Sequence, residues 1–430
     1  MELTLLGFAA LFAILFLGVP IAFGMGGVGL VGFAHLIGWG PALDSLGQLS
    51  IDSMKSYSLS VMPLFLLMGN LITQARLSED LYAASNAFIG HLRGGLAIAT
   101  IFACGGVSAV CGSSLATVAT MSKIAIPSMR RFGYDQGLAA GAVAAGGTLG
   151  ILIPPSIILV IYGNLTETDI GKLFIAGVIP GLIGIALYAL AIVAVTRVHP
   201  ERGPPGPRAS RAERVRRAGS VWAVALLFIG VLGGIYLGVF TPTEAAGIGA
   251  AGALGLALAR RELTPRKLLD ILIETATMSG KLMILILGAD LFSNFINVAG
   301  MPATIASWVQ SLEWSPLMVI IGLMVVYVVL GCVLDGLSIV LLTVPVVFPL
   351  VQGLGIDAVW FGILLVVVVE VGLITPPIGL NVFVMRSVLP EVPTAVIFRG
   401  LAPFIGADIV RLTIFVLYPG TILFLPSLMG

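Results

Sequence analysis

One motif occurs twice in this chain, and it constrains the possible folds more than any other feature. The segment 150–155, Gly-Ile-Leu-Ile-Pro-Pro, is matched by the segment 372–377, Gly-Leu-Ile-Thr-Pro-Pro, and each lies inside a long apolar stretch. Two adjacent prolines remove two backbone donors and clash with the preceding turn, so a continuous helix cannot pass through them. In lipid, such broken backbone persists only where protein shields it or where it lines a polar cavity. Paired interruptions of this kind indicate the binding site of a secondary transporter.

Composition identifies the broad class of protein. Of the 430 residues, 58% are hydrophobic and 10% are charged, with a mean hydropathy of +1.11, whereas soluble domains contain about 25% charged residues. We therefore expect an all-α polytopic membrane protein in a lipid bilayer. The net charge of +1 gives no indication of nucleic-acid binding. Because no Lys or Arg precedes Lys55, the N-terminal segment is predicted to be a retained span and not a cleaved signal peptide.

Two further features relate one half of the chain to the other. Pro20 and Pro242 each interrupt an apolar run, and each stands 134 residues before the first proline of the pair in its own half. A Gly/Ser-rich interruption lies in between, at 105–114 in the first half and at 331–338 in the second. Three features in register predict two structural repeats.

The predicted repeats span 1–196 and 220–430, and a basic, proline-bearing linker at 197–219 joins them. Such a loop is typical of the cytoplasmic side of a membrane, and a nucleic-acid-binding loop is the weaker alternative. Its arginines are Arg197, Arg202, Arg208, Arg211, Arg214, Arg216 and Arg217.

Each repeat is predicted to contain three helices, a re-entrant hairpin, a broken helix and a final helix. Hairpin arms are shorter than the roughly 20 residues that a full span needs. The first repeat places these elements at about 4–18, 20–37, 58–75, 96–126, 137–163 and 173–196, and the second at about 220–240, 244–260, 269–299, 316–350, 358–389 and 400–426. Scaffold helices are expected at about 1–75 and 220–260, and the hairpins and broken helices of a transport domain at about 94–165 and 316–389.

The distribution of positive charge predicts that the two repeats have inverted topology. Five crossings per repeat, with the linker in the cytoplasm, place both termini in the periplasm. Of the 22 Lys and Arg residues, Lys55 and Lys172 alone would then lie outside, Lys123, Lys281 and Arg411 would lie within or near membrane segments, and the others would lie inside. This bias agrees with the positive-inside rule.

The hairpin tips and the helix breaks can together bind ions. Broken helices offer positive N-terminal dipole ends and unwound carbonyls, and the tips at 112–114 and 335–338 are expected to meet Gly150 and Gly372 near the midplane of the membrane. Serine hydroxyls and Thr375 add hard oxygen ligands, which favour Na⁺. The alternative is that these small residues only pack helices, with serines bonding back to their own helix.

Several polar side chains at membrane depth are candidates for this path. A carboxylate there costs about 2.5–3.5 kcal/mol, so Asp335 is expected to contact the ion directly or through one neighbouring group. Glu370 is either protonated or paired with Lys281. Asn381 follows the second break and is expected to contact substrate or ion. One helix face carries a further set, which lines the path or joins two helices: Asp290, Asn294 and Asn297.

Longer motifs resemble the large membrane subunit of tripartite ATP-independent periplasmic (TRAP) transporters. The resemblance runs from near residue 1 to near 425, and Cys111 is a mild departure because the family commonly has Ser there. The matching motifs are 63–70, 91–95, 146–156, 241–246, 334–337 and 370–381. The family implies a bacterial or archaeal inner-membrane protein that imports organic acids with the Na⁺ gradient. It also implies a small four-helix membrane subunit, here as a separate chain, and a soluble periplasmic substrate-binding protein.

The resemblance and the repeats together imply an elevator-type, Na⁺-coupled importer of a carboxylate such as sialic acid or a C4-dicarboxylate, with Na⁺ as coupling ion and no other cofactor. Na⁺ is expected at Ser108, Gly112, Ser113 and Gly150, and at Asp335, Gly336, Gly372 and Thr375. Substrate is expected between the tips, at Ser114, Pro155, Pro377 and Asn381.

Three other interpretations remain. A stand-alone Na⁺/dicarboxylate symporter of related fold would need no binding protein. A major-facilitator carrier also has two halves and a basic middle loop, but its halves run parallel. An enzyme is disfavoured, because His35, His91 and His199 form no metal-spaced pair. The cysteines, Cys104, Cys111 and Cys332, are expected to be small buried residues with no disulfide and no transition-metal site.

Overall fold

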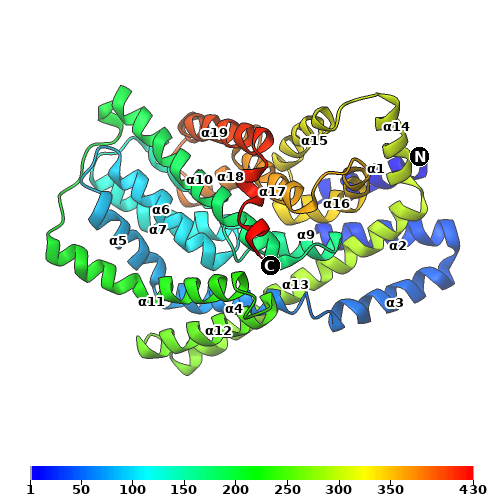
Figure 1. The fold of residues 1–430 in the computed structure, drawn as a ribbon, viewed down its shortest axis with the longest axis horizontal. Helices are drawn as coiled ribbons and strands as arrows, with labels where there is room; N and C mark the ends of the chain where they lie inside the picture. The colour runs from blue at the N-terminus through cyan, green and yellow to red at the C-terminus, as the bar shows by residue number, and fades with distance from the viewer. Residues whose placement is uncertain (1, 430) are drawn as a thin grey trace.

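The computed structural model of the protein describes residues 2–429, apart from the side chains of 109–111. Within this range the chain folds mainly into helices (Figure 1). The first repeat and the segment after it contain α1 (Glu2–Phe16), α2 (Ile21–Ile37), α3 (Trp39–Lys55), α4 (Val61–Gln74), α5 (Leu77–Ile89), α6 (Gly95–Cys111), α7 (Ser114–Arg131), α8 (Gln136–Thr148), η1 (Leu149–Ile151), α9 (Ile157–Thr166), α10 (Ile170–Val198) and η2 (Pro200–Arg202).

The second repeat contains the same kinds of element in the same order. They are α11 (Arg211–Tyr236), α12 (Pro242–Ala259), α13 (Pro265–Val298), α14 (Met301–Ser311), α15 (Pro316–Gly331), α16 (Gly336–Gly353), α17 (Ala358–Ile374), α18 (Leu380–Val388), α19 (Thr394–Leu417), α20 (Gly420–Leu423) and η3 (Pro426–Leu428). The predicted hairpins are α6–α7 and α15–α16, and the predicted broken helices are α8–α9 and α17–α18.

Matching caps begin the broken helices of the two repeats. Asp135 accepts a hydrogen bond from the Leu138 amide at 2.9 Å, and Asp357 accepts one from the Trp360 amide at 2.8 Å. Each carboxylate satisfies one of the free amides at a helix start. Both breaks contain a cis Pro-Pro bond. The repeats therefore agree in local structure as well as in sequence.

Equivalent helices pack reciprocally across the two repeats, as an inverted pair requires. Helix α4 packs on α12 while α2 packs on α13, and α7 packs on α18 while α16 packs on α9. Helix α8 likewise packs on α19 while α17 packs on α10. Exchange of equivalent surfaces is what a two-fold relation produces. Figure 1 shows α4, α11, α12 and α13 along the lower side of the molecule, with α17, α18 and α19 above them.

Some boundaries differ from the sequence-based expectation. Helix α6 continues through Gly105 and Gly106 to Cys111, so the interruption of the first hairpin is much shorter than 105–114. Helix α11 begins at Arg211, inside the expected linker, because Ser210 caps it by accepting from the Glu213 amide. The last long helix ends at Leu417 and not near 426, two residues before Pro419.

Helices α3, α5 and α14 were not expected from the sequence. Each is amphipathic and moderately polar and has an exposed face, so none resembles an apolar span. In the described part of the chain, the helices long and apolar enough to cross a membrane are α10, α11, α13, α16 and α19. The other apolar helices are shorter, as half-helices and many hairpin arms are.

A close helix–helix contact joins α8 to α19 through glycines. A Cβ at Gly400 would lie 1.9 Å from the Gly137 carbonyl oxygen, and one at Gly141 would lie 2.5 Å from the Gly400 carbonyl oxygen. Small residues let membrane helices approach to backbone contact. This contact fixes the position of the first broken helix against the second repeat.

We expect Gly400→Ala to destabilise the protein by about 1–3 kcal/mol, because a methyl group has no space at this contact. Gly406→Ala on the same helix is the control, since a Cβ there meets nothing within 4 Å. Thermal unfolding in detergent measures both. A Gly400 variant as stable as the Gly406 variant would contradict the close contact.

Candidate functional site

Four short segments, two hairpin tips and two helix breaks, lie together. Tip 1 (112–114) and tip 2 (331–336) connect the two arms of each hairpin, and break 1 (149–156) and break 2 (372–379) contain the Pro-Pro pairs that interrupt the long helices. A Cβ at Gly112 would lie 3.4 Å from the Pro155 carbonyl oxygen, so tip 1 contacts break 1. The Gly379 amide donates to the Cys332 carbonyl at 3.3 Å, so tip 2 contacts break 2.

Tip 1 turns sharply and then starts a helix. Gly112 has φ of +57°, a conformation that residues with a Cβ seldom adopt. Its amide donates to the Ser108 carbonyl at 3.0 Å. Ser113 then caps α7, with its hydroxyl accepting from the Ala116 amide at 3.4 Å. The turn therefore places the N-terminus of α7 beside break 1.

Oxygen atoms surround Gly150 on the side where a Cβ would point. That position lies 3.2 Å from the Ser113 carbonyl oxygen, 3.2 Å from Thr117 Oγ1 and 3.3 Å from Ser108 Oγ. Ser108 is fully buried, and its hydroxyl has no hydrogen-bond partner within the protein. We call this group of three oxygens the Gly150 cradle. The structure thus brings together Ser108, Ser113 and Gly150 of the first predicted Na⁺ set.

Thr117 belongs to the cradle but was not predicted from the sequence. Its hydroxyl donates to the Ser113 carbonyl at 2.9 Å, so it can still accept an interaction from another group. The sequence feature that could have predicted Thr117 is its position four residues after Ser113, which places both residues on the same face of α7.

The second predicted Na⁺ set is arranged differently. Asp335 caps α16, accepting from the amides of Leu337 at 3.1 Å and Ser338 at 3.2 Å, and Ser338 Oγ also donates to it. Thr375 Oγ1 donates to the Val371 carbonyl at 2.6 Å, within its own helix. Both predicted ligands therefore have partners within the protein.

Glycines bring tip 2 and break 2 into backbone contact. A Cβ at Gly372 would lie 2.5 Å from Gly331 Cα, so Gly372 faces Gly331. A Cβ at Gly336 would lie 2.8 Å from Ile158 Cδ1 of α9 and 3.7 Å from Ile151 Cδ1 of break 1. Tip 2 therefore touches both breaks. Cys332 Sγ is 3.2 Å from the Pro376 carbonyl oxygen. Gly331 was missed, although it opens the Gly-containing segment of the second hairpin.

Two predicted substrate contacts lie together. Ser114 Oγ is 2.9 Å from Asn381 Oδ1 and 2.8 Å from Asn381 Nδ2, and both residues are buried. Asn381 Nδ2 also donates to the Ala144 carbonyl at 3.0 Å. The pair joins tip 1 to the half-helix that follows break 2. The other two predicted contacts differ in exposure, since Pro155 is buried and Pro377 is exposed.

Glu370 has a partner that the sequence analysis did not identify. Arg411 Nη2 lies 2.5 Å from Glu370 Oε2 and 2.8 Å from Asp408 Oδ1, and all three side chains are buried. The proposed pairing with Lys281 is therefore wrong. The sequence feature that could have predicted this partner is the pair Asp408 and Arg411, three residues apart in the apolar segment of α19.

Two of the remaining polar candidates on α13 bond to serine side chains. Asn294 of α13 donates to Ser45 of α3 at 3.2 Å, and Asn297 donates to Ser293 at 3.3 Å in its own helix. Cys104 and Cys332 are free and buried, as expected, whereas the side chain of Cys111 lies outside the described part. Among the described residues, no group of His, Cys, Asp and Glu could hold a metal ion.

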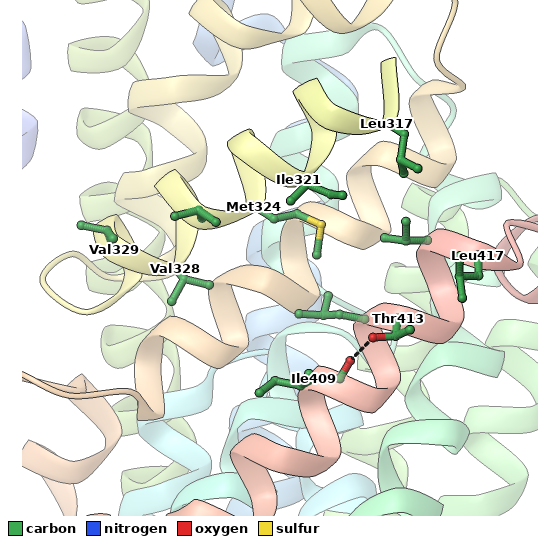
Figure 2. A pocket seen from close by; sticks show the side chains of 11 residues that line it. Leu317, Ile321, Met324, Val328, Val329, Ile409, Thr413 and Leu417 are labelled. Atoms are coloured by element: carbon green, nitrogen blue, oxygen red, sulfur yellow. Dashed lines mark hydrogen bonds between the residues drawn. The ribbon is translucent and has the colours of Figure 1, made fainter. Parts of the chain in front are cut away.

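An apolar groove of about 480 Å³ between α15 and α19 lies outside this site (Figure 2). Leu317, Ile321 and Met324 line one wall, and Ile409 lies on the other. Thr413 is its polar side chain, and the threonine hydroxyl donates to the Ile409 carbonyl at 2.7 Å. The groove thus has no free donor for an acid, and it suits lipid or another apolar surface.

Comparisons with known proteins agree with this architecture. The family model "Tripartite ATP-independent periplasmic transporter, DctM component" matches residues 8–421. A "C4-dicarboxylate TRAP transporter large permease protein" from Pseudomonas aeruginosa is 40% identical over 407 residues, covering 94% of each chain. An "Ectoine TRAP transporter large permease protein" from Halomonas elongata is 32% identical and covers 99% of each chain. A "2,3-diketo-L-gulonate TRAP transporter large permease protein" from Escherichia coli is 31% identical and covers 95% of each.

A solved structure has the same fold. The Alcanivorax borkumensis YdaH transporter, whose crystal structure is described as revealing an unusual topology, aligns with a TM-score of 0.67 at 15% identity. The alignment covers 88% of this chain and 89% of that one. The likeness supports the helical repeat architecture alone. With the family match and the relatives, it leads to one conclusion: this chain belongs to the family of DctM components, the large permease proteins of TRAP transporters.

Proposed function

We propose that this chain imports an organic acid across the bacterial inner membrane and that Na⁺ binding at the Gly150 cradle drives the import. The carrying observation is the buried Ser108 hydroxyl, which has no partner and lies beside two further oxygens. A buried hydroxyl without a partner costs about 1–3 kcal/mol. A small hard cation with oxygen ligands offsets this cost, whereas an apolar packing role for Ser108 does not.

Substrate is proposed to bind between the tips, near Ser114 and Asn381. The N-terminus of α7 supplies donors that suit a carboxylate, and Ser114 and Asn381 would exchange their bonds to each other for bonds to the acid. The relatives are named for C4-dicarboxylate, ectoine and 2,3-diketo-L-gulonate, so one permease architecture serves several substrates. This variety supports selection of the substrate by a separate periplasmic binding protein. We infer a carboxylate, first sought among C4-dicarboxylates.

In the proposed cycle, the hairpins and broken helices move as one transport domain against a scaffold formed by the outer helices. A small four-helix membrane subunit, made as a separate chain, would extend that scaffold. The positive charge of the cytoplasmic loops supports an orientation with both termini in the periplasm. A second Na⁺ is proposed at tip 2 and break 2, near Asp335 and Gly372.

Ser108→Ala should weaken Na⁺ binding at least about tenfold, because a cation loses one of its oxygen ligands in a desolvated site. Thr100→Val is the control, since it removes another buried hydroxyl from α6, one that donates to the Leu96 carbonyl at 2.8 Å. Na⁺ titration by calorimetry in detergent measures both. Equal Na⁺ affinity in the two variants would contradict the proposed cradle.

Asp335→Asn separates an ion role from a capping role. Asparagine caps helices about as well as aspartate, so α16 should persist and the melting temperature should change little. If the carboxylate also helps to bind Na⁺, the Na⁺ concentration for half-maximal uptake should rise, or uptake should stop. An unchanged Na⁺ dependence would leave Asp335 with its capping role alone.

The isolated chain in proteoliposomes should take up almost no substrate, and the small subunit with the cognate binding protein should restore Na⁺-driven uptake. The reason is that substrate is delivered by the binding protein. Radiolabelled succinate, a C4-dicarboxylate, is the first substrate to test. Strong uptake by the chain alone would favour the stand-alone Na⁺/dicarboxylate symporter.

A further inference from the structure

A chain of buried polar side chains joins the two helix breaks. At one end is Thr148, the last residue of α8, whose hydroxyl donates to the Ala145 carbonyl at 2.7 Å and lies 3.3 Å from the Tyr188 hydroxyl of α10. The Tyr188 hydroxyl donates to Asp408 of α19, 2.9 Å from each carboxylate oxygen. Arg411 then pairs with Asp408 at 2.8 Å and with Glu370 of α17 at 2.5 Å. We call these five polar side chains the Arg411 network, and none is more than 1% exposed.

The internal repeat relates one end of this network to the other. Thr148 stands two residues before Gly150, and Glu370 stands two residues before Gly372. Tyr188 and Arg411 are also equivalent, because each lies eight residues after the proline inside its helix, Pro180 or Pro403. The two repeats therefore meet at this network, with two neutral residues from the first and three charged residues from the second.

The contact at the centre is built closely. The Arg411 guanidinium lies over the Tyr188 ring, with Cζ 5.7 Å from the ring centroid, an arrangement that attracts a cation to the ring face. Gly184 provides the space, since a Cβ there would lie 2.6 Å from Arg411 Nη1. Both α10 and α19 thus hold the guanidinium.

The network is costly as a purely structural device. Ions buried at membrane depth lose hydration, and a well-packed apolar cluster is often as stable as a buried ion pair. The network also leaves Glu370 Oε1, Arg411 Nε and Arg411 Nη1 without partners in the protein. Such a partly satisfied network can exchange its hydrogen bonds when its neighbours move, which is the property of a coupling element.

We propose that Arg411, Asp408 and Tyr188 are positioning residues that couple the two Na⁺ sites, an inference that rests on the proposed function. Na⁺ in the Gly150 cradle fixes break 1 and, two residues away, Thr148. The position of Thr148 then acts through Tyr188 and Asp408 on the Arg411 guanidinium. The guanidinium in turn holds Glu370, and with it the end of α17 near Gly372. Occupancy of one site then favours the backbone geometry of the other, and the coupling is reciprocal.

Tyr188→Phe removes only the hydroxyl oxygen and keeps the aromatic ring beneath Arg411. It therefore tests the hydrogen-bonded link without removing the ring contact. Thr148→Val tests it from the other side of the same contact. Tyr162→Phe is the matched control: this tyrosine is also fully buried, and its hydroxyl donates to the Ala358 carbonyl at 2.7 Å, away from the network. The readouts are Na⁺ titration by calorimetry on the isolated chain and Na⁺-dependent uptake with the partner proteins.

We expect Tyr188→Phe and Thr148→Val to lower the Hill coefficient for Na⁺ towards one and to raise the half-saturating Na⁺ concentration about fivefold or more, which is the lower range for coupled sites. Tyr162→Phe should lower the melting temperature by about as much as the other two substitutions do, and its Na⁺ titration curve should match that of the wild type. A structural role alone would change all three variants alike, and that result would overturn the coupling.

Two further outcomes separate this inference from the function on which it rests. If wild-type protein neither binds Na⁺ nor depends on it for uptake, the proposed function and the coupling both fail. If wild-type Na⁺ dependence is cooperative and Tyr188→Phe retains the same Hill coefficient, the Arg411 network is not the coupling element while Na⁺-driven import stands. If Tyr188→Phe does not fold, Thr148→Val decides between these outcomes, because the valine side chain has nearly the same shape as that of threonine.

Discussion

The structure depends on one constraint: backbone polar groups at membrane depth must find partners inside the protein. Two Pro-Pro pairs release carbonyls and amides in the middle of apolar helices, and the fold surrounds each break with a hairpin tip from the same repeat and elements of the other repeat. Gly112 meets Pro155, and Cys332 meets Pro376 and Gly379. The polar groups released at the breaks therefore face other polar groups of the protein.

Repeat symmetry organises these contacts, and small departures from it give the two halves separate roles. The first tip leaves the Ser108 hydroxyl unpartnered beside Gly150. The second tip uses Asp335 to cap its own helix and brings Gly331 against Gly372. The first Pro-Pro pair is buried, and the second is exposed. One repeat thus provides a closed oxygen-lined cradle, while the other keeps its break accessible from outside the protein interior.

Charge burial follows the same pattern. Arg411, Asp408 and Glu370 are held by helices that flank both breaks, and Tyr188 connects them to the first. Because a charge at membrane depth is costly without partners, these side chains restrict how α17 and α19 can lie against α8 and α10. The same groups that stabilise the junction of the repeats can therefore transmit a change from one break to the other.

The sequence by itself determined the helical membrane class, the two repeats, the hairpins and the broken helices, because glycine, proline and apolar runs act through local backbone chemistry. Together with the family resemblance, the repeats also indicated Ser108, Ser113 and Gly150 as candidates. Only the tertiary structure decided that Glu370 pairs with Arg411 and not with Lys281, that Thr117 joins the cradle and that Gly372 faces Gly331. These contacts join residues from different helices, and the spacing of residues along one helix does not specify which neighbour lies across from it.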